Sequence, residues 1–106
     1  MIIEKIKKRN GEIVSFDRTK IEQAMGKAFL ATGVTVSPET LSDLTDRVIT
    51  VLQEKFIEQI PGVEDVQDIV ELKLAEAEYF DVAKKYIIYR RERSEAREKK
   101  KQKIIW

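Results

Sequence analysis

Apolar residues recur along most of this chain at the spacing of one face of an α-helix, and they fall into four separate segments. In the first segment the apolar face would comprise Ile21, Ala24, Met25, Ala28 and Phe29. We expect this helix to run from Arg18 to about Thr32. Gly33 would end it, because glycine readily takes the left-handed conformation that closes many helices.

The second segment opens with a strong helix start signal, Ser37-Pro38-Glu39. A serine side chain caps the first turn, proline suits the first helical position, and an acidic residue is favourable near the positive end of the helix dipole. The expected buried stripe comprises Leu41, Leu44, Val48, Val51, Leu52 and Phe56. We expect this helix to run to about Gln59.

Pro61 and Gly62 then break the chain, and two further helices follow. The third is expected to begin near Glu64, with an inward face of Val66, Ile69, Val70, Leu74 and Ala77. The fourth is expected to begin around Asp81 and to carry on one face Val82, Tyr86, Tyr89 and Arg93. The charged run up to Lys103 has little to bury, so we expect it to continue as an exposed helix and then to fray.

The first 16 residues predict a β-hairpin. Asn10-Gly11 suits a two-residue turn with two positive φ angles, which would fold the strand carrying Lys8 and Arg9 back on residues 13–16. Asp17 is then expected to cap the first helix. The unpaired N–H groups at the start of that helix would lie close to the hairpin cations, an arrangement that favours phosphate binding.

These elements predict one α+β domain, a four-helix bundle capped by a small sheet that is either the hairpin alone or three strands. The chain has 106 residues, of which 42% are hydrophobic and 37% charged, and this balance is sufficient for a single core. The sequence contains no stretch long enough to cross a bilayer and no secretory signal pattern. A cytoplasmic protein is therefore the default expectation.

Composition also narrows the chemistry, because the chain contains neither cysteine nor histidine. Disulfides, thiolate zinc sites and a cysteine nucleophile or radical are excluded, and catalysis would need perturbed carboxylates or lysines, of which no close pair stands out. The glycine-rich motifs G-x-x-x-x-G-K-[ST] and G-x-G-x-x-G are also missing. Any nucleotide site must therefore use side chains, and a stand-alone enzyme is not expected.

The charges are nearly balanced, with 20 basic and 19 acidic residues, but they are unevenly distributed. Basic residues gather at both ends of the chain, and acidic residues gather in its third quarter. If the two ends meet in space, Lys8, Arg9 and Arg93 would act together on an anion such as phosphate. Lys20 belongs with them, because the first turn of a helix disfavours a cation unless an anion is nearby. The alternative is a cluster of ordinary solvated cations.

Several candidate residues have two open interpretations. Asp17 could cap the helix or accept from the amino group of an adenine, and the two roles compete for the same oxygens. Gln67 could bond a sugar hydroxyl or face water, and Arg93 could approach a ligand or pair with the acidic third helix. Tyr86 and Tyr89 are expected to be core or rim aromatics, and Tyr89 is included in the expected site.

Three segments of the chain resemble the ATP-cone family, the regulatory module found at the N-terminus of many ribonucleotide reductases. They are Ile6-Lys-Lys-Arg-Asn-Gly-Glu-Ile-Val-Ser-Phe-Asp-Arg-Thr-Lys-Ile21, Val63-Glu-Asp-Val-Gln-Asp-Ile-Val70 and Val82-Ala-Lys-Lys-Tyr-Ile-Ile-Tyr-Arg-Arg-Glu-Arg93. The resemblance covers about residues 2–95, with the segments in the family's order and spacing. It implies a small helical bundle capped by a short sheet.

The resemblance also implies which residues contact a nucleotide. Those that would hold phosphates are Lys8, Arg9, Lys20 and Arg93. Those that would surround or recognise the adenine are Ile6, Val14, Asp17 and Ile21. Val63 and Gln67 would border the sugar and phosphates, and Val63 can offer only its backbone and an apolar wall. A magnesium ion is expected with the nucleotide, which would supply most of the ligands to the metal.

By the same resemblance, the module binds ATP or dATP and signals to the catalytic or radical-generating subunit of a ribonucleotide reductase, with ATP permitting activity and dATP stopping it. It would have no catalysis of its own, and a nucleotide-dependent homo-oligomer is a further expectation, whereas a membrane is not expected as a partner. The regulatory domain would occupy residues 1–95. Residues 96–106 would form a charged extension, in the position of a linker to a catalytic domain.

The main alternative function is a nucleic-acid-binding regulatory module that uses the basic ends of the chain. A family relative joins the same module to a zinc-ribbon DNA reader, but the cysteines of such a reader are missing here. DNA contact would rest on the lysine-rich tail and should be weak and strongly salt-dependent, so nucleic acid is not the expected partner. A helical domain with a decayed site is a second alternative, and the four retained cations argue against it.

Overall fold

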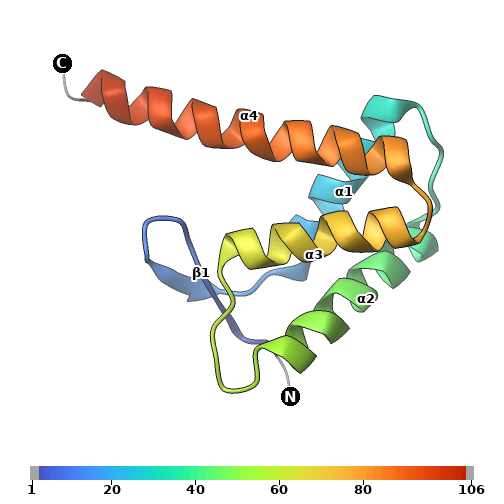
Figure 1. Cartoon of the computed structure of the whole chain (residues 1–106), viewed down its shortest axis with the longest axis horizontal. Coiled ribbons are helices and arrows are strands. Elements are labelled where there is room, and N and C mark those ends of the chain that lie inside the picture. Colours follow the sequence, from blue (N-terminus) through green and yellow to red (C-terminus); the bar gives the residue numbers. More distant parts are fainter. Residues whose placement is uncertain (1–2, 105–106) are drawn as a thin grey trace.

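The computed structural model describes the backbone of residues 3–104 and the side chains of residues 3–93. Its elements are β1 (Lys5–Lys7), β2 (Ile13–Ser15), α1 (Arg18–Thr32), α2 (Pro38–Lys55), α3 (Val63–Glu76) and α4 (Phe80–Ile104). The hairpin lies beside the first turns of α1 and α3, and α4 runs along the opposite side of α3 from α2 (Figure 1). This arrangement confirms the expected α+β class, and the charged run continues α4 as expected.

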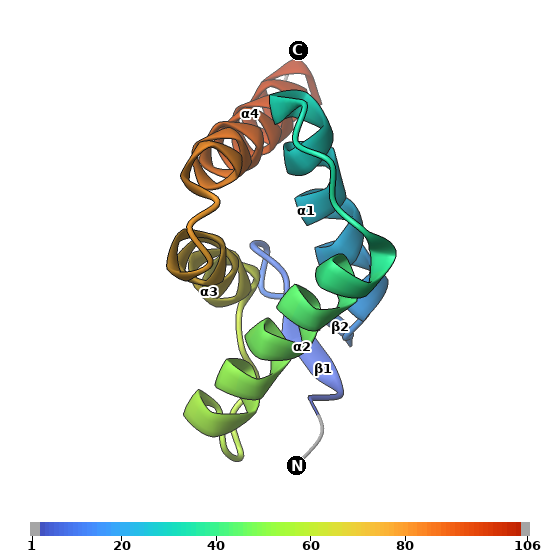
Figure 2. The same cartoon turned by 90° about the vertical axis from the view of Figure 1, so that its right-hand side faces the viewer.

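The four helices enclose one apolar core. α1 packs against α2 and α4, and α3 packs against the same two helices (Figure 2). The side chains that are almost wholly buried include Met25, Phe29, Val48, Leu52, Val70, Leu74 and Val82. Phe29 also meets the ring of Tyr79 edge-on, with centroids 5.0 Å apart. The apolar periodicity therefore predicted the inward faces of the helices correctly.

Most helix ends follow the local signals. Asp17 caps α1, Gly33 ends it with a φ of 73°, and Ser37 caps α2 by accepting from the N–H of Thr40. The expected end of α2 near Gln59 is wrong. The helix closes where the Phe56 N–H donates to the Leu52 carbonyl, and the chain then reverses in a tight turn that includes Glu58 at a φ of 60°.

The hairpin pairs Lys5 with Ser15, Ile6 with Val14 and Lys7 with Ile13. Its turn differs from the predicted two-residue type, because the Lys8 N–H donates to the Glu12 carbonyl across a three-residue loop. Of the loop residues only Gly11 has a positive φ, at 88°, so the predicted second positive φ at Asn10 is wrong. The Asn10 side chain instead accepts from the Glu12 N–H at 2.9 Å, which stabilises this longer loop.

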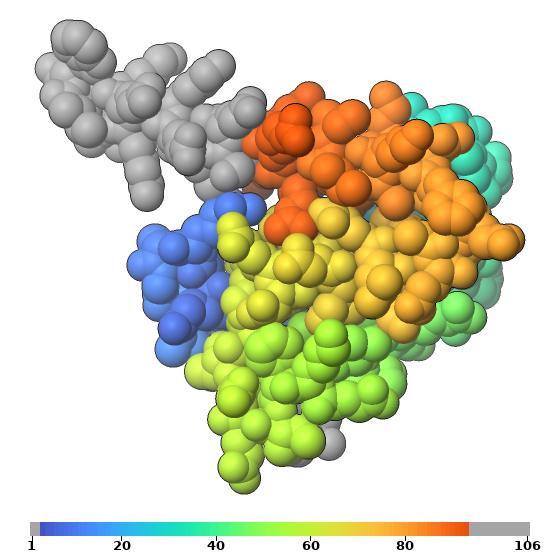
Figure 3. Space-filling view, viewed as in Figure 1, coloured from blue at the N-terminus to red at the C-terminus, as the bar shows by residue number. Residues whose placement is uncertain are grey.

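Within residues 3–104 the sheet has two strands, so the hairpin alone forms the cap. A single parallel bridge joins Lys7 to Gly62, and the Lys7 N–H donates to the Pro61 carbonyl at 3.0 Å. This backbone contact holds the hairpin against the start of α3. In the space-filling view, the blue atoms of the hairpin lie directly beside the yellow atoms of α3 (Figure 3). None of the helices in this part of the chain is both long enough and apolar enough to span a membrane.

Candidate functional site

A cavity of about 540 Å³ lies among the hairpin, the first turns of α1 and α3, and α4. All eleven residues predicted for the site line it, namely Ile6, Lys8, Arg9, Val14, Asp17, Lys20, Ile21, Val63, Gln67, Tyr89 and Arg93. The other lining residues are Ser15, Phe16, Ala24, Val66 and Tyr86. The structure thus gathers, around one hollow, residues from Ile6 to Arg93, which come from nearly opposite ends of the chain.

Among the side chains of residues 3–93, four cations from three elements line this cavity. Lys8 precedes the hairpin loop and Arg9 lies in it, Lys20 comes from the first turn of α1, and Arg93 comes from α4. Lys8, Lys20 and Arg93 are exposed, and the Arg9 side chain is partly exposed. Cations from both ends of the described part of the chain, Lys8 and Arg9 from one and Arg93 from the other, therefore meet, which was the condition for a shared anion site. Several cations around one concave surface attract an anion more strongly than any one of them does alone.

Apolar side chains form another part of the wall. Ile6 and Val14 are paired across the hairpin and half-buried, and Phe16 follows them. The buried side chains of Ile21 and Val66 complete this part of the wall. A cavity with an apolar wall and several cations suits a ligand that combines a flat ring with phosphates.

Arg9 is held by the start of α3. Its guanidinium donates to Glu64 Oε1 at 2.9 Å and to Gln67 Oε1 at 3.2 Å. Glu64 and Gln67 lie three positions apart, so they share one face of the helix. The amide of Gln67 is therefore part of the cavity wall and accepts a hydrogen bond from Arg9. Of the two roles expected for Gln67, this position favours contact with a ligand over simple exposure to water.

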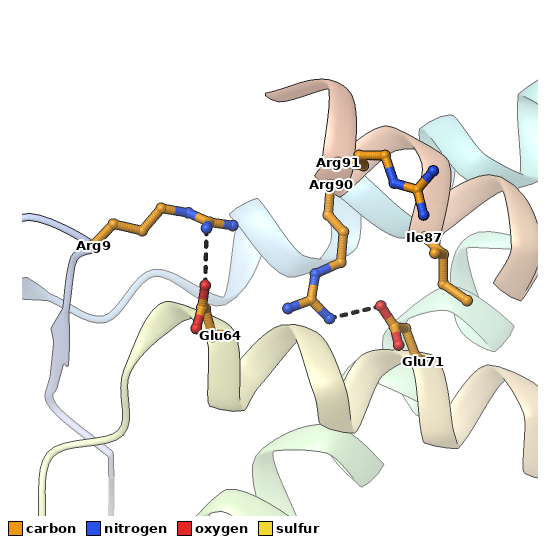
Figure 4. A pocket seen from close by; sticks show the side chains of 6 residues that line it. All are labelled: Arg9, Glu64, Glu71, Ile87, Arg90 and Arg91. Atoms are coloured by element: carbon orange, nitrogen blue, oxygen red, sulfur yellow. Dashed lines mark hydrogen bonds and ion pairs between the residues drawn. The ribbon is translucent and has the colours of Figure 1, made fainter. Parts of the chain in front are cut away.

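A second cavity, of about 400 Å³, lies beside the first and shares Arg9 with it (Figure 4). Across it, Arg90 donates to Asp68 at 2.9 Å and to Glu71 at 2.7 Å, so that α4 is bound to α3. Burial opposes the charge on Arg90, but these carboxylates outweigh it and raise the pKa of Arg90 above its ordinary value. The sequence had offered Arg93 for this ion pair, whereas the structure uses Arg90, one turn earlier.

Asp17 caps α1, as expected, and it also lies at the cavity. Its Oδ1 accepts from the Thr19 N–H at 3.0 Å and from the Thr19 hydroxyl at 2.6 Å, and these bonds lower the pKa of Asp17. Both cap bonds end on the same oxygen, so the cap uses only one of the two carboxylate oxygens. Asp17 is thus a helix cap that also lines the cavity.

The two tyrosines of α4 differ in their surroundings. Tyr86 is buried, and burial raises the pKa of its hydroxyl well above the ordinary value. Tyr89 is half-buried, and the Lys27 ammonium lies 5.7 Å from the centre of its ring. Tyr86 lines the cavity although the sequence analysis did not include it in the site. Its position one turn before Tyr89 on the same face was the available signal.

Comparisons with known proteins agree with this geometry. Residues 4–95 match the family model of the ATP cone domain. The chain is 40% identical over 102 residues to a ribonucleoside-diphosphate reductase subunit alpha of Chlamydia pneumoniae, which covers 90% of this chain and 10% of that protein. It is 37% identical over 107 residues to a vitamin B12-dependent ribonucleoside-diphosphate reductase of Thermoplasma acidophilum, which covers 93% of this chain and 13% of that protein.

A further relative is a vitamin B12-dependent ribonucleoside-diphosphate reductase of Mycobacterium tuberculosis, 39% identical over 93 residues, with 88% of this chain and 13% of that protein covered. The chain therefore spans about a tenth of the length of these relatives. The family match extends over most of the described chain and includes every residue that lines the cavity. By this match the chain belongs to the ATP cone domain family, whose members are nucleotide-binding regulatory modules.

Proposed function

We propose that this chain binds ATP or dATP in the 540 Å³ cavity and thereby regulates the overall activity of a ribonucleotide reductase. The observation that carries the proposal is the meeting of cations from both ends of the chain at one partly apolar hollow. A triphosphate needs several positive groups at once, and an adenine needs a flat apolar surface with few polar groups.

In the proposed complex the phosphates contact Lys8, Arg9, Lys20 and Arg93. The adenine lies against Ile6, Val14 and Ile21, with Asp17 accepting from its amino group. Val63 and Gln67 border the sugar and phosphates, and Tyr89 lies at the rim. The Asp17 oxygen outside the cap bonds is the one suited to the adenine, so the two roles of this residue do not compete.

The expected affinity is compatible with side chains alone. Charge-assisted hydrogen bonds contribute about 1.5–3 kcal/mol each, and a micromolar complex corresponds to about 8 kcal/mol. Four such contacts contribute about 6–12 kcal/mol, so they reach the micromolar value and, in the upper part of this range, leave a surplus that offsets desolvation and lost motion. The side chains of residues 3–93 form no cluster of three metal-binding groups. In our proposal a magnesium ion arrives with the nucleotide, and its oxygen ligands come mainly from phosphates and water.

The proposed regulation depends on the elements that one bound nucleotide would contact. A nucleotide in the cavity contacts the hairpin, the first turn of α1 and α4 together, so its binding favours one relative position of these elements. The partner proposed to sense this change is the catalytic or radical-generating subunit, with a homo-oligomer as a further readout. ATP and dATP differ by one hydroxyl, so discrimination requires a sugar contact or a different number of bound molecules.

The remaining expectations belong to the same proposal. The chain itself would perform no catalysis and would act in the cytoplasm. The charged extension over residues 96–106 and its linker role stay predictions. The lysines on which the nucleic-acid alternative depended lie among residues 94–106, whose side chains are outside the described part of the chain.

Calorimetric titration of the 106-residue chain with ATP, dATP, GTP and CTP, with magnesium and at two salt concentrations, tests the function. We expect adenine-selective binding that Lys8→Ala or Arg9→Ala weakens about 10- to 100-fold, since each removes one charge-assisted contact. Lys84→Ala is the control, because Lys84 is an exposed cation of α4 that does not line the cavity. Binding that ignored the base, together with salt-sensitive affinity for duplex DNA, would contradict the proposal.

A further inference from the structure

Glu64 occupies a particular position beside the proposed phosphate site. It lies in the first turn of α3, and its carboxylate accepts from Arg9 at 2.9 Å. Its side chain is 66% exposed, whereas that of Arg9 is 28% exposed. A carboxylate is chemically similar to a phosphate oxygen group, because both accept from the planar fork of a guanidinium.

Arg9 lies at the boundary between the two cavities, since it lines both. Of the two cavities, Glu64 lines only the smaller one. Figure 4 shows its carboxylate directly below the Arg9 guanidinium. Gln67, by contrast, lines only the larger cavity and accepts from a different nitrogen of the same guanidinium, at 3.2 Å. The guanidinium is therefore shared between an acceptor on each side.

We propose that Glu64 is a built-in competitor for polyphosphate: it holds Arg9 in the ligand-free chain and must give it up when phosphates bind. The inference rests on the proposed function, because it concerns the regulation of affinity at the same site. Gln67 is neutral and lines the proposed site itself, so it keeps its contact and directs Arg9 to the ligand. Glu64 thus lowers the affinity for phosphate-bearing ligands without touching them.

The strength of the pair makes such an exchange feasible. An ion pair this exposed changes an equilibrium constant only by a small factor, so a polyphosphate with several negative charges can displace it. Repulsion between Glu64 and the bound phosphates acts in the same direction. Removing the charge of Glu64 should therefore tighten ATP binding by about three- to tenfold.

The experiment compares Glu64→Gln with the unmodified 106-residue chain by calorimetry with ATP and magnesium at low salt. Asp68→Asn is the matched control, because Asp68 is an equally exposed carboxylate of α3, at 69%, that pairs with Arg90. We expect the control to change ATP affinity by less than about twofold. Adenosine, measured by competition with ATP, should bind the Glu64→Gln chain no more tightly, because it carries no phosphate.

A double-mutant cycle separates competition for Arg9 from a general change in charge. In an Arg9→Ala background, Glu64→Gln should lose most of its effect on ATP, because the group for which Glu64 competes is gone. Unchanged or weaker ATP binding by Glu64→Gln would overturn the inference, as would an equal gain for adenosine or a full gain without Arg9. An unmodified chain that bound ATP in those cases would leave the proposed function standing, whereas one that bound no adenine nucleotide would overturn both.

Discussion

The interior of the helical bundle and the cavity beside the hairpin are built by the same helices in opposite ways. In the interior, Met25, Val48, Leu52 and Leu74 have no exposed surface. Around the cavity the cations are exposed, and the apolar pair of the hairpin is only half-buried. Buried apolar surface stabilises the fold, whereas accessible charge serves a ligand. The charged part of the site and most of the core are therefore carried by different residues, whereas Ile21, Val66 and Tyr86 are buried in the core and also line the cavity.

The division runs along single helices. The first turn of α1 places Lys20 at the cavity, while Met25 and Phe29 farther along fill the core. In α4 the order is reversed, with Val82 in the core near the start and Arg93 at the cavity. In α1 and α4, one end thus serves the core and the other the cavity, and substitutions at the two ends should separate stability from binding.

The largest expected effect is in the core. Phe29→Ala removes a side chain that is 1% exposed and its edge contact with Tyr79, so we expect the free energy of unfolding to fall by about 3–5 kcal/mol. Urea denaturation measures the loss. ATP affinity of the chain that remains folded at low temperature should stay within about twofold. A large loss of affinity would show that core and cavity are not separable.

Arg93→Ala tests the cavity end of α4. Loss of one charge-assisted contact of about 1.5–3 kcal/mol should weaken ATP binding about 10- to 100-fold, as measured by calorimetry. Arg47→Ala is the control, because Arg47 is an exposed arginine of α2 that pairs with Asp43. The free energy of unfolding of both variants should lie within about 0.5 kcal/mol of that of the unmodified chain. Equal ATP affinity of the two variants would contradict the meeting of both chain ends at the ligand.

A substitution at Gly11 or at Gly33 would introduce similar backbone strain, at the cavity in the first case and at the end of α1 in the second. Gly11 in the hairpin loop and Gly33 at the end of α1 have φ angles of 88° and 73°, and a Cβ at either would meet no atom within 4 Å. Alanine at either position should cost about 1–2 kcal/mol through the left-handed conformation alone. Gly33→Ala should lower only the unfolding midpoint in urea. Gly11→Ala should also weaken ATP binding, since Arg9 lies in the same loop and Lys8 directly precedes it.

The smallest expected effect concerns Asp17, which caps α1 and also lines the cavity. Its pKa in the folded chain is lowered from 3.8, so its charge adds stability above that pH and the contribution is lost as the pH falls through the folded value. Asp17→Asn keeps a capping side chain but does not titrate. The stability difference between the two chains should therefore shrink below pH 3.8, as followed by urea denaturation. A constant difference would contradict the charged cap.

Local signals explain what could be predicted of the fold. Ser37, Gly33 and the apolar stripes act within a few residues, and they gave the helix faces and most helix ends. The end of α2 and the hairpin turn were predicted wrongly, because each depends on neighbours. α2 stops where the chain must turn back toward the hairpin, and the Asn10 side chain bonds forward to Glu12.

The cavity followed a similar rule. The resemblance to a family named ten of the eleven residues, and the face of the fourth helix added Tyr89. The charge pattern indicated that the chain ends should meet. The partners of Arg9 and Arg90 were not predicted. Which carboxylate of α3 faces which arginine depends on the rotation of α3 relative to α4 and the hairpin, and periodicity along one helix does not give that rotation.

The bond from the Lys7 N–H to the Pro61 carbonyl has a consequence for how such a module can evolve. It joins two main chains, so nearly any side chain at these positions preserves it, and proline at 61 keeps the carbonyl that accepts. The position of the hairpin against α3 therefore depends little on side-chain substitutions at Lys7 and Pro61. Charges in the neighbouring loop can change, and with them the preferred anion, while the framework that presents them stays in place.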